Sequence, residues 1–360
     1  DGGLYLLQHP YDMNRCTWKV FVHEPDNPQS LGDNMVYSIG TDENTGNIWI
    51  GTRSGLSVLD KDDFSVFYNY HVNHKSDFYF PCREVNSIVS DASGNMWLGT
   101  ANSGLVMVKR NNHFFENFTI DYSNDNILTP SANAIYVDDR NQLWWGLTSQ
   151  GFMCMDLDTR TFQHFSSMPE FKNIKTMSSV NCFMKRKITG ELWIGLFGDG
   201  VCVYEEGHEA KIFNSWNCSF IKDNSVYSLF EDHDGNVWIG TKAGLSILQT
   251  NGNGYIFNSL YVDGHDYSIS TINCISQDSE GNIWIATDED GIVKMSGDFM
   301  HPKKIKSKAY GHWNNAMPTS GILCIFVDSQ QRIWVGTQNC GLFTLSLIHI
   351  SEPTRRRGIS

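Results

Sequence analysis

The sequence predicts an all-β fold, a seven-bladed β-propeller of four-stranded antiparallel blades. A tryptophan-centred motif recurs seven times, its spacing is nearly constant, and every copy carries the same order of strand and turn residues; residues 46–52 (GNIWIGT), 94–100 and 235–241 are clear copies. Successive motif tryptophans are 48, 47, 49, 45, 46 and 50 residues apart, which is the length of a propeller blade. We expect these seven side chains to form the core: Trp49, Trp97, Trp144, Trp193, Trp238, Trp284 and Trp334.

Each repeat contains the same elements in order. A first strand, as at 36–39, is followed by a polar turn, as at 91–95, and then by the tryptophan strand. A short glycine turn leads to a third strand, as at 55–59, and an outer strand, as at 64–68, ends the unit. Alternating apolar residues separated by Gly, Asn and Asp turns are typical of antiparallel strands.

One position of the first strand holds only small side chains, which we attribute to crowding near the central axis. Three of the nine cysteines occupy this position, and two more, Cys154 and Cys202, fall in third strands, so we expect these five to be buried apolar residues. The cysteines show no CxxC spacing, so we expect neither a zinc site nor a redox motif. The sequence leaves open whether two of Cys16, Cys82, Cys218 and Cys340 form a disulfide bond. The small residues are Ser38, Ser87, Ala134, Cys182, Ser228, Cys274 and Cys324.

The two ends of the chain are expected to share the closing blade. Six units are whole, while residues 320–344 supply the first strands of a seventh and residues 3–22 resemble its last strands. Gly3–Leu7 and Gly341–Leu345 both resemble a third strand, and only one can occupy that place. We therefore assign residues 1–344 to the propeller. Residues 345–360 include LSLIHISEPTR, which resembles a translated sequencing adapter, so we expect a non-native tail on a fragment of a longer protein.

The composition excludes several classes of function. With 40 acidic and 27 basic residues the net charge is −13, which disfavours nucleic acid or an anionic membrane as a partner. No hydrolase, metalloprotease, Walker or dinucleotide motif is present, and we expect no cofactor and no metal. The turn that begins at Asp232 is similar to the start of a calcium loop, but its twelfth position is Ala243 instead of Glu, so we interpret it as a turn.

The repeat, with its Asp-x-x-Gly-Asn-x-Trp-Ile-Gly-Thr-x-x-Gly-Leu pattern, resembles the two-component regulator propeller repeat over about residues 1–344. The segment 23–31 also resembles that family's inter-blade segment. Departures occur in the third unit, where 141–145 lacks the turn glycine, and in the fourth, where 187–191 lacks the leading Asp.

The resemblance implies a periplasmic sensor region of a hybrid two-component regulator from Bacteroidota. It implies detection of an oligosaccharide to control glycan-utilisation genes, with a second propeller and a β-sandwich of the parent chain as partners. The histidine kinase domain of such a parent is not part of this sequence, so we expect no enzyme activity from it. The sequence leaves open whether the chain forms a homodimer.

The strand order places the Asp-x-x-Gly-Asn hairpins on one face and the variable inter-blade loops, beside the short glycine turns, on the other. Recognition usually belongs to such loops. Trp216 and Trp313 lie there next to asparagines, and an aromatic ring beside amides suits a sugar. Arg83 and Lys222 could contact a carboxylate or sulfate. The predicted ligand residues are Trp216, Trp313, His312, Tyr79, Arg83, Lys222, Tyr267 and Tyr310, with Tyr261 on the same face.

Two other functions stay open from the sequence. One is a propeller lyase of the streptogramin-lyase kind, whose repeats also carry Asp-x-x-Gly-x-x-Trp turns; it would need a catalytic His and a metal-binding acidic group on one face. The other is a non-catalytic scaffold that contacts only protein.

Overall fold

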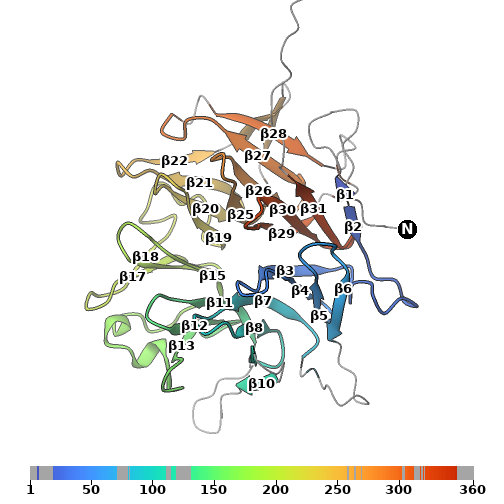
Figure 1. The fold of residues 1–360 in the computed structure, drawn as a ribbon. Coiled ribbons are helices and arrows are strands. Elements are labelled where there is room, and N and C mark those ends of the chain that lie inside the picture. The colour runs from blue at the N-terminus through green and yellow to red at the C-terminus, as the bar shows by residue number, and fades with distance from the viewer. Residues whose placement is uncertain are drawn as a thin grey trace, which may run out of the picture.

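Seven antiparallel sheets surround a common axis in the computed structural model (Figure 1). The structure describes residues 6–7, 19–70, 80, 82–110, 115–118, 131–257, 259–262, 265–268, 270–301, 305–311, 317, 319 and 321–346. The predicted all-β, seven-bladed propeller is confirmed. Over the described ranges, no helix has the length and apolar character needed to cross a membrane.

The first five blades each contain four consecutive strands. The first comprises β3 (Val36–Thr41), β4 (Ile48–Thr52), β5 (Gly55–Leu59) and β6 (Val66–Tyr70); the second β7 (Val85–Ser90), β8 (Met96–Thr100), β9 (Leu105–Val108) and β10 (Phe115–Phe118); the third β11 (Ala132–Val137), β12 (Gln142–Leu147), β13 (Phe152–Asp156) and β14 (Phe162–His164). Two 3-10 turns, η1 (Phe165–Ser167) and η2 (Pro169–Phe171), lead to the fourth blade, β15 (Val180–Lys185), β16 (Leu192–Leu196), β17 (Gly200–Tyr204) and β18 (Lys211–Phe213). The fifth is β19 (Val226–Glu231), β20 (Val237–Thr241), β21 (Gly244–Leu248) and β22 (Gly254–Phe257).

The sixth blade carries an additional hairpin. Its four strands are β25 (Ile272–Gln277), β26 (Ile283–Thr287), β27 (Ile292–Ser296) and β28 (Lys306–Tyr310). The connection from the fifth blade forms β23 (Ser259–Val262) and β24 (His265–Ser268), and β23 pairs with β28 at Val262 and Ser307. The segment that contains Tyr261 and Tyr267 therefore extends the outer edge of a sheet.

The closing blade joins both ends of the chain, as predicted. Strands β29 (Ile322–Val327), β30 (Arg332–Thr337) and β31 (Leu342–Ser346) come from the C-terminal part, and β2 (Lys19–Phe21) pairs antiparallel with β31 as the fourth strand. The short β1 (Leu6–Leu7) also pairs with β31, in parallel (Figure 1). Strand β31 thus occupies the third-strand place for which two segments competed. It ends at Ser346, and the rest of the predicted tail, 347–360, lies outside the described residues.

The motif tryptophans are buried, as expected, in cores shared between neighbouring blades. Trp49 packs with Val85 and Leu98 of the second blade, and Trp238 packs with Ile272 of the sixth. The same arrangement continues around the ring, and Trp334 of the seventh blade closes it against the first blade. Since each core needs two adjacent blades, no blade buries its apolar surface alone.

The polar hairpins hold these tryptophans by hydrogen bonds. In five blades the indole Nε1–H donates to an Asp six positions earlier, at 2.8–3.1 Å. In the fourth blade, which lacks that Asp, Glu191 accepts from Trp193 at 3.3 Å. In the third blade, which lacks the turn glycine, Asn141 adopts the same left-handed conformation, with φ of 60°. Both sequence departures are therefore accommodated locally.

Small residues of the first strands are crowded by the innermost strand of the neighbouring blade. Ser38 Oγ donates to the carbonyl oxygen of Val85 in the next blade, and Cys274 Sγ contacts the carbonyl of Ile325. A larger side chain here would push adjacent blades apart.

Arg332 connects the last blade to the first. We call the contact between these two blades the seam. It stands where the other hairpins carry Asn, and it bonds to Asp328 within its own hairpin. Its Nη1 donates to the carbonyl of Lys61 at 2.9 Å, and its guanidinium lies 4.8 Å from the ring centroid of Phe64. The side chain therefore joins parts of the chain that are about 270 residues apart.

We expect Arg332→Asn to lower the free energy of unfolding by about 1–3 kcal/mol, because the seam hydrogen bond and the cation–π contact are lost. The hairpin itself should survive, since Asn95, Asn236 and Asn282 bond to the equivalent Asp in other blades. Urea unfolding measures the change. The exposed Arg110→Asn is the control, with an expected change within about 0.5 kcal/mol; equal effects of the two substitutions would refute the seam role.

The five cysteines expected in the core are free thiols, of which Cys154, Cys202 and Cys324 are buried and Cys182 and Cys274 half-buried; Cys82, Cys218 and Cys340 are also free. Cys16 lies outside the described residues. Burial raises the pKa of the Cys182 and Cys202 thiols to about 12. These groups are therefore poor nucleophiles at neutral pH.

The raised thiol pKa predicts that alkali destabilises the fold. Above about pH 9 the unfolded chain releases a thiol proton that the folded chain keeps, so the free energy of unfolding falls from about pH 9 to 12. For the fully buried Cys202 the slope is about 1.4 kcal/mol per pH unit. Urea unfolding between pH 7 and 10.5 tests this, and Cys202→Ala should reduce the slope; an unchanged slope would contradict the assignment.

Candidate functional site

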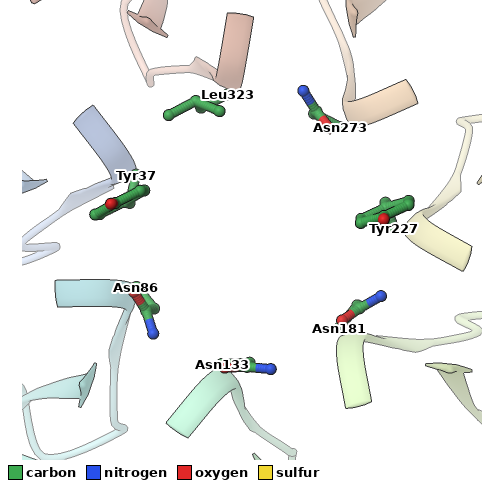
Figure 2. A pocket seen from close by; sticks show the side chains of 7 residues that line it. All are labelled: Tyr37, Asn86, Asn133, Asn181, Tyr227, Asn273 and Leu323. Atoms are coloured by element: carbon green, nitrogen blue, oxygen red, sulfur yellow. The ribbon is translucent and has the colours of Figure 1, made fainter. Parts of the chain in front are cut away.

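Seven side chains, one from each blade, line a cavity of about 320 Å³ on the propeller axis (Figure 2). Each comes from the first strand of its blade, at a β-bulge. In β3, for example, Val36 pairs with Thr52 and Ser38 with Gly51, so Tyr37 has no partner and is the extra residue. A bulge redirects a side chain, and the same register shift occurs in all seven first strands. We call these residues the channel ring: Tyr37, Asn86, Asn133, Asn181, Tyr227, Asn273 and Leu323.

Three asparagines of the channel ring are held in place by the next blade. Asn86, Asn181 and Asn273 each donate one Nδ2 hydrogen to a carbonyl oxygen at the start of the following first strand, at 3.3, 3.0 and 2.8 Å. Among the described residues, no partner occupies the carbonyl oxygen or the second N–H of these three amides. The amides are thus oriented by the fold and keep hydrogen-bonding capacity for a ligand.

Carboxylates surround the two tyrosines of the channel ring. Burial raises the pKa of Tyr227, and Asp223 and Asp288 raise it further. Burial also raises the pKa of Tyr37, as do Glu84 and Asp33, against the lowering effect of Arg53. Both phenols therefore stay protonated, and each can donate a hydrogen bond at neutral pH.

The inter-blade loops lie beside the short glycine turns, as predicted. The backbone amides of Gly198 and Gly200 donate to the carbonyl of Asn224 in the loop before β19. The backbone amides of Arg53 and Asp288, in the same turn of their blades, donate to the carbonyls of Met35 and Thr271, just before the first strand of the same blade. Because the channel ring follows directly after these loops in the first strands, the cavity opens toward this loop face.

Trp216 projects from a braced loop between β18 and β19, with 82% of its surface exposed. Asn214 Oδ1 accepts from the backbone amide of Trp216, and Asn217 Oδ1 accepts from that of Asn214. Asn217 Nδ2 donates to the carbonyl of Ile212. Both ends of the Asn217 amide hold the loop, which leaves it one N–H and one lone pair for a sugar hydroxyl. The indole is accessible, and its ligand role stays a prediction.

The remaining predicted ligand residues have varied positions. Arg83 is exposed and Lys222 is half-buried, both in inter-blade segments. Tyr310 lies in β28 and stacks on Trp284 with ring centroids 6.0 Å apart, so its placement is that of a core contact and adds no support to a ligand role. The side chain of Tyr267 and the residues Tyr79, His312 and Trp313 lie outside the described residues, and their roles stay predictions.

Sequence reasoning missed the channel ring, although a signal existed. The ring position is the variable residue just before the small one, and it holds Asn in four of seven units. An amide there is unexpected in an inner strand with apolar neighbours. Alternation alone could not find it, because a bulge breaks the period of two.

A closed ring of seven blades with a polar axial cavity defines the class of protein: a seven-bladed β-propeller. Four segments, 79–102, 221–243, 266–289 and 316–339, match the family described as two component regulator propeller. Four of the seven units therefore match the two-component regulator propeller repeat. The matched segments surround Trp97, Trp238, Trp284 and Trp334; the unmatched units include the two that depart from the repeat pattern.

Comparisons with known proteins agree on the fold. The chain is 31% identical over 117 residues to histidine kinase P4 of Formosa agariphila, a match that covers 31% of this chain and 8% of the kinase. It superposes with a TM-score of 0.70 and 22% identity on an extracellular domain described as that of the hybrid two component system BT3049 from B. thetaiotaomicron, covering 90% of this chain and 41% of that one. A streptogramin B lyase shares the fold at a TM-score of 0.62 and 12% identity, covering 89% of this chain and 94% of the lyase. The chain thus spans less than half of the kinase and of the BT3049 domain.

Proposed function

We propose that this propeller is the ligand-sensing part of a periplasmic sensor region in a hybrid two-component regulator. Its loop face binds an oligosaccharide, and binding controls glycan-utilisation genes through a kinase elsewhere in the parent protein. A second propeller and a β-sandwich of that protein are its partners. The chain itself has no catalytic role.

The exposed indole of Trp216 carries this proposal. An aromatic side chain with 82% of its surface in water, on a loop held by five side-chain hydrogen bonds, is an apolar platform on a fixed backbone. Such a platform stacks on the apolar face of a sugar and loses little entropy on binding. The repeat family and the likeness to the BT3049 extracellular domain support a sensor context.

The test is a screen of the purified chain on an array of plant, fungal and host glycans, followed by calorimetry with the best binder. We expect Trp216→Ala to weaken binding tenfold or more, because the stacking surface is lost. Trp216→Phe keeps a ring and should retain most of the affinity. Trp313→Ala tests the second predicted aromatic residue in the same way.

Phe162→Ala is the matched control, since Phe162 is an exposed aromatic residue on the outer strand β14. Undiminished binding in both Trp216→Ala and Trp313→Ala would remove the proposed site. Breakdown of a bound glycan that a chelator abolishes would instead favour a lyase. Affinity for protein with no glycan binding would favour the scaffold.

A further inference from the structure

The channel ring is separate from the Trp216 loop, and the repeated structure of the blades creates it. Seven independent bulges direct seven side chains at one cavity (Figure 2). A bulge interrupts the strand ladder, and here it occurs at the same step in every blade. The side chains differ between blades, so the ring is asymmetric and can distinguish the orientations of a ligand.

The ring carries no formal charge. Its polar groups are four amides and two phenols, and Leu323 is its one apolar member. A charged ligand group would lose its hydration in this cavity without gaining an opposite charge from the ring. Asp33, Glu84, Asp223 and Asp288 lie close enough to the ring tyrosines to affect their pKa. Those carboxylates further disfavour an anionic group, while Arg53 is already paired with Asp33 at 3.2 Å.

The hydrogen-bonding capacity of the ring suits hydroxyl groups. A hydroxyl both donates and accepts, and each oriented amide offers an acceptor and a donor side by side. Tyr37 and Tyr227 add phenol hydroxyls and ring surface from separate parts of the ring (Figure 2). A polyol with some apolar C–H surface therefore satisfies the lining better than an aromatic or aliphatic ligand, which would leave several polar groups without partners.

The shape of the site limits how such a ligand enters. The seven first strands surround the cavity laterally, it is open toward the loop face, and its volume of about 320 Å³ is at the lower end for small-molecule sites. A long chain that lies across the mouth cannot place its interior units within the ring. A unit at the end of a chain, or at the tip of a branch, can enter along the axis.

From these observations we infer that the channel ring binds one uncharged, hydroxyl-rich terminal unit of a glycan, inserted end-on from the loop face. The inference rests on the proposed function, that this propeller binds an oligosaccharide. It specifies which part of the glycan is recognised and at which site. Trp216 would then contact units further along the chain.

The experiment uses the same array, which must carry neutral oligosaccharides beside counterparts with sialic acid, uronic acid or sulfate on the terminal unit. We expect the neutral form to bind at least tenfold more tightly. Asn181→Leu should weaken that binding at least tenfold. We expect this variant to fold, because Leu323 already occupies the equivalent position in the seventh blade. Tyr227→Phe removes a single hydroxyl and tests the ring even if Asn181→Leu is unstable.

Asn253→Leu is the matched control, because Asn253 is an exposed asparagine in the turn between β21 and β22, on the opposite face. If no glycan binds, the proposed function and this inference both fail. If Trp216→Ala weakens binding while Tyr227→Phe and a folded Asn181→Leu do not, the function stands and the inference is overturned. Preference for the terminally charged counterpart also overturns it.

Discussion

Asp232→Asn should destabilise the propeller by about 3 kcal/mol or more. Asp232 is 4% exposed, and its carboxylate accepts from two backbone amides, from Asn236 Nδ2 and from Trp238 Nε1. An asparagine in either orientation turns an N–H group toward two of these donors. Two buried donors then lose their acceptor, and each such loss costs about 1–3 kcal/mol. Urea unfolding followed by circular dichroism measures the difference.

Asp42→Asn is the control, since Asp42 begins the equivalent hairpin of the first blade. Its Oδ2 accepts from the hydroxyl of Thr45, which can reverse and accept from an amide, whereas an indole N–H cannot. Within the described residues, the indole of Trp49 has no bond to Asp42. We expect a change below about 1 kcal/mol; losses of equal size in the two variants would show that the Asp232 network is not what stabilises the hairpin.

Gly336→Val should open the seam of the ring and lower the free energy of unfolding by about 3 kcal/mol or more. A Cβ at Gly336 would lie 2.7 Å from Cγ1 of Val36 in the first blade and still closer to Sγ of Cys324. Both neighbours are buried, so neither can move without separating the blades. Overpacking of a tight core typically costs about 1–3 kcal/mol, and valine adds three carbons where none fits.

Two further variants calibrate this result. Gly336→Ala should lie between wild type and Gly336→Val, because it adds one carbon only. Ala286 occupies the equivalent position of the sixth blade, so Ala286→Gly should change stability by about 1 kcal/mol at most. A Gly336→Val protein as stable as wild type would mean that the seam is loosely packed, against the geometry described above.

The architecture was predictable because it depends on local, repeated signals. Seven tryptophans at nearly constant intervals predict the blade count, and the order of strands and turns predicts which face carries the loops. Those signals act within about 50 residues and need no knowledge of contacts. The exposed Trp216 could be anticipated on the same basis, as an aromatic residue outside the repeat.

Much of the candidate site could not be predicted, because it depends on contacts between blades. The bulge at Tyr37 and its equivalents alters strand register without a distinctive residue type. The three asparagine bonds to the next blade join residues 45–49 positions apart. The engagement of Asn217 by its own loop is likewise a matter of side-chain geometry.

The sequence by itself determined the number of blades, the identity of their core tryptophans and the order of strands within a repeat, since each follows from periodicity along the chain. Only the tertiary structure decided that every tryptophan core is shared with the next blade, and that seven bulged residues meet at one axial cavity. Ring closure is the physical reason: it brings equivalent positions of distant repeats together, and no single repeat contains that information.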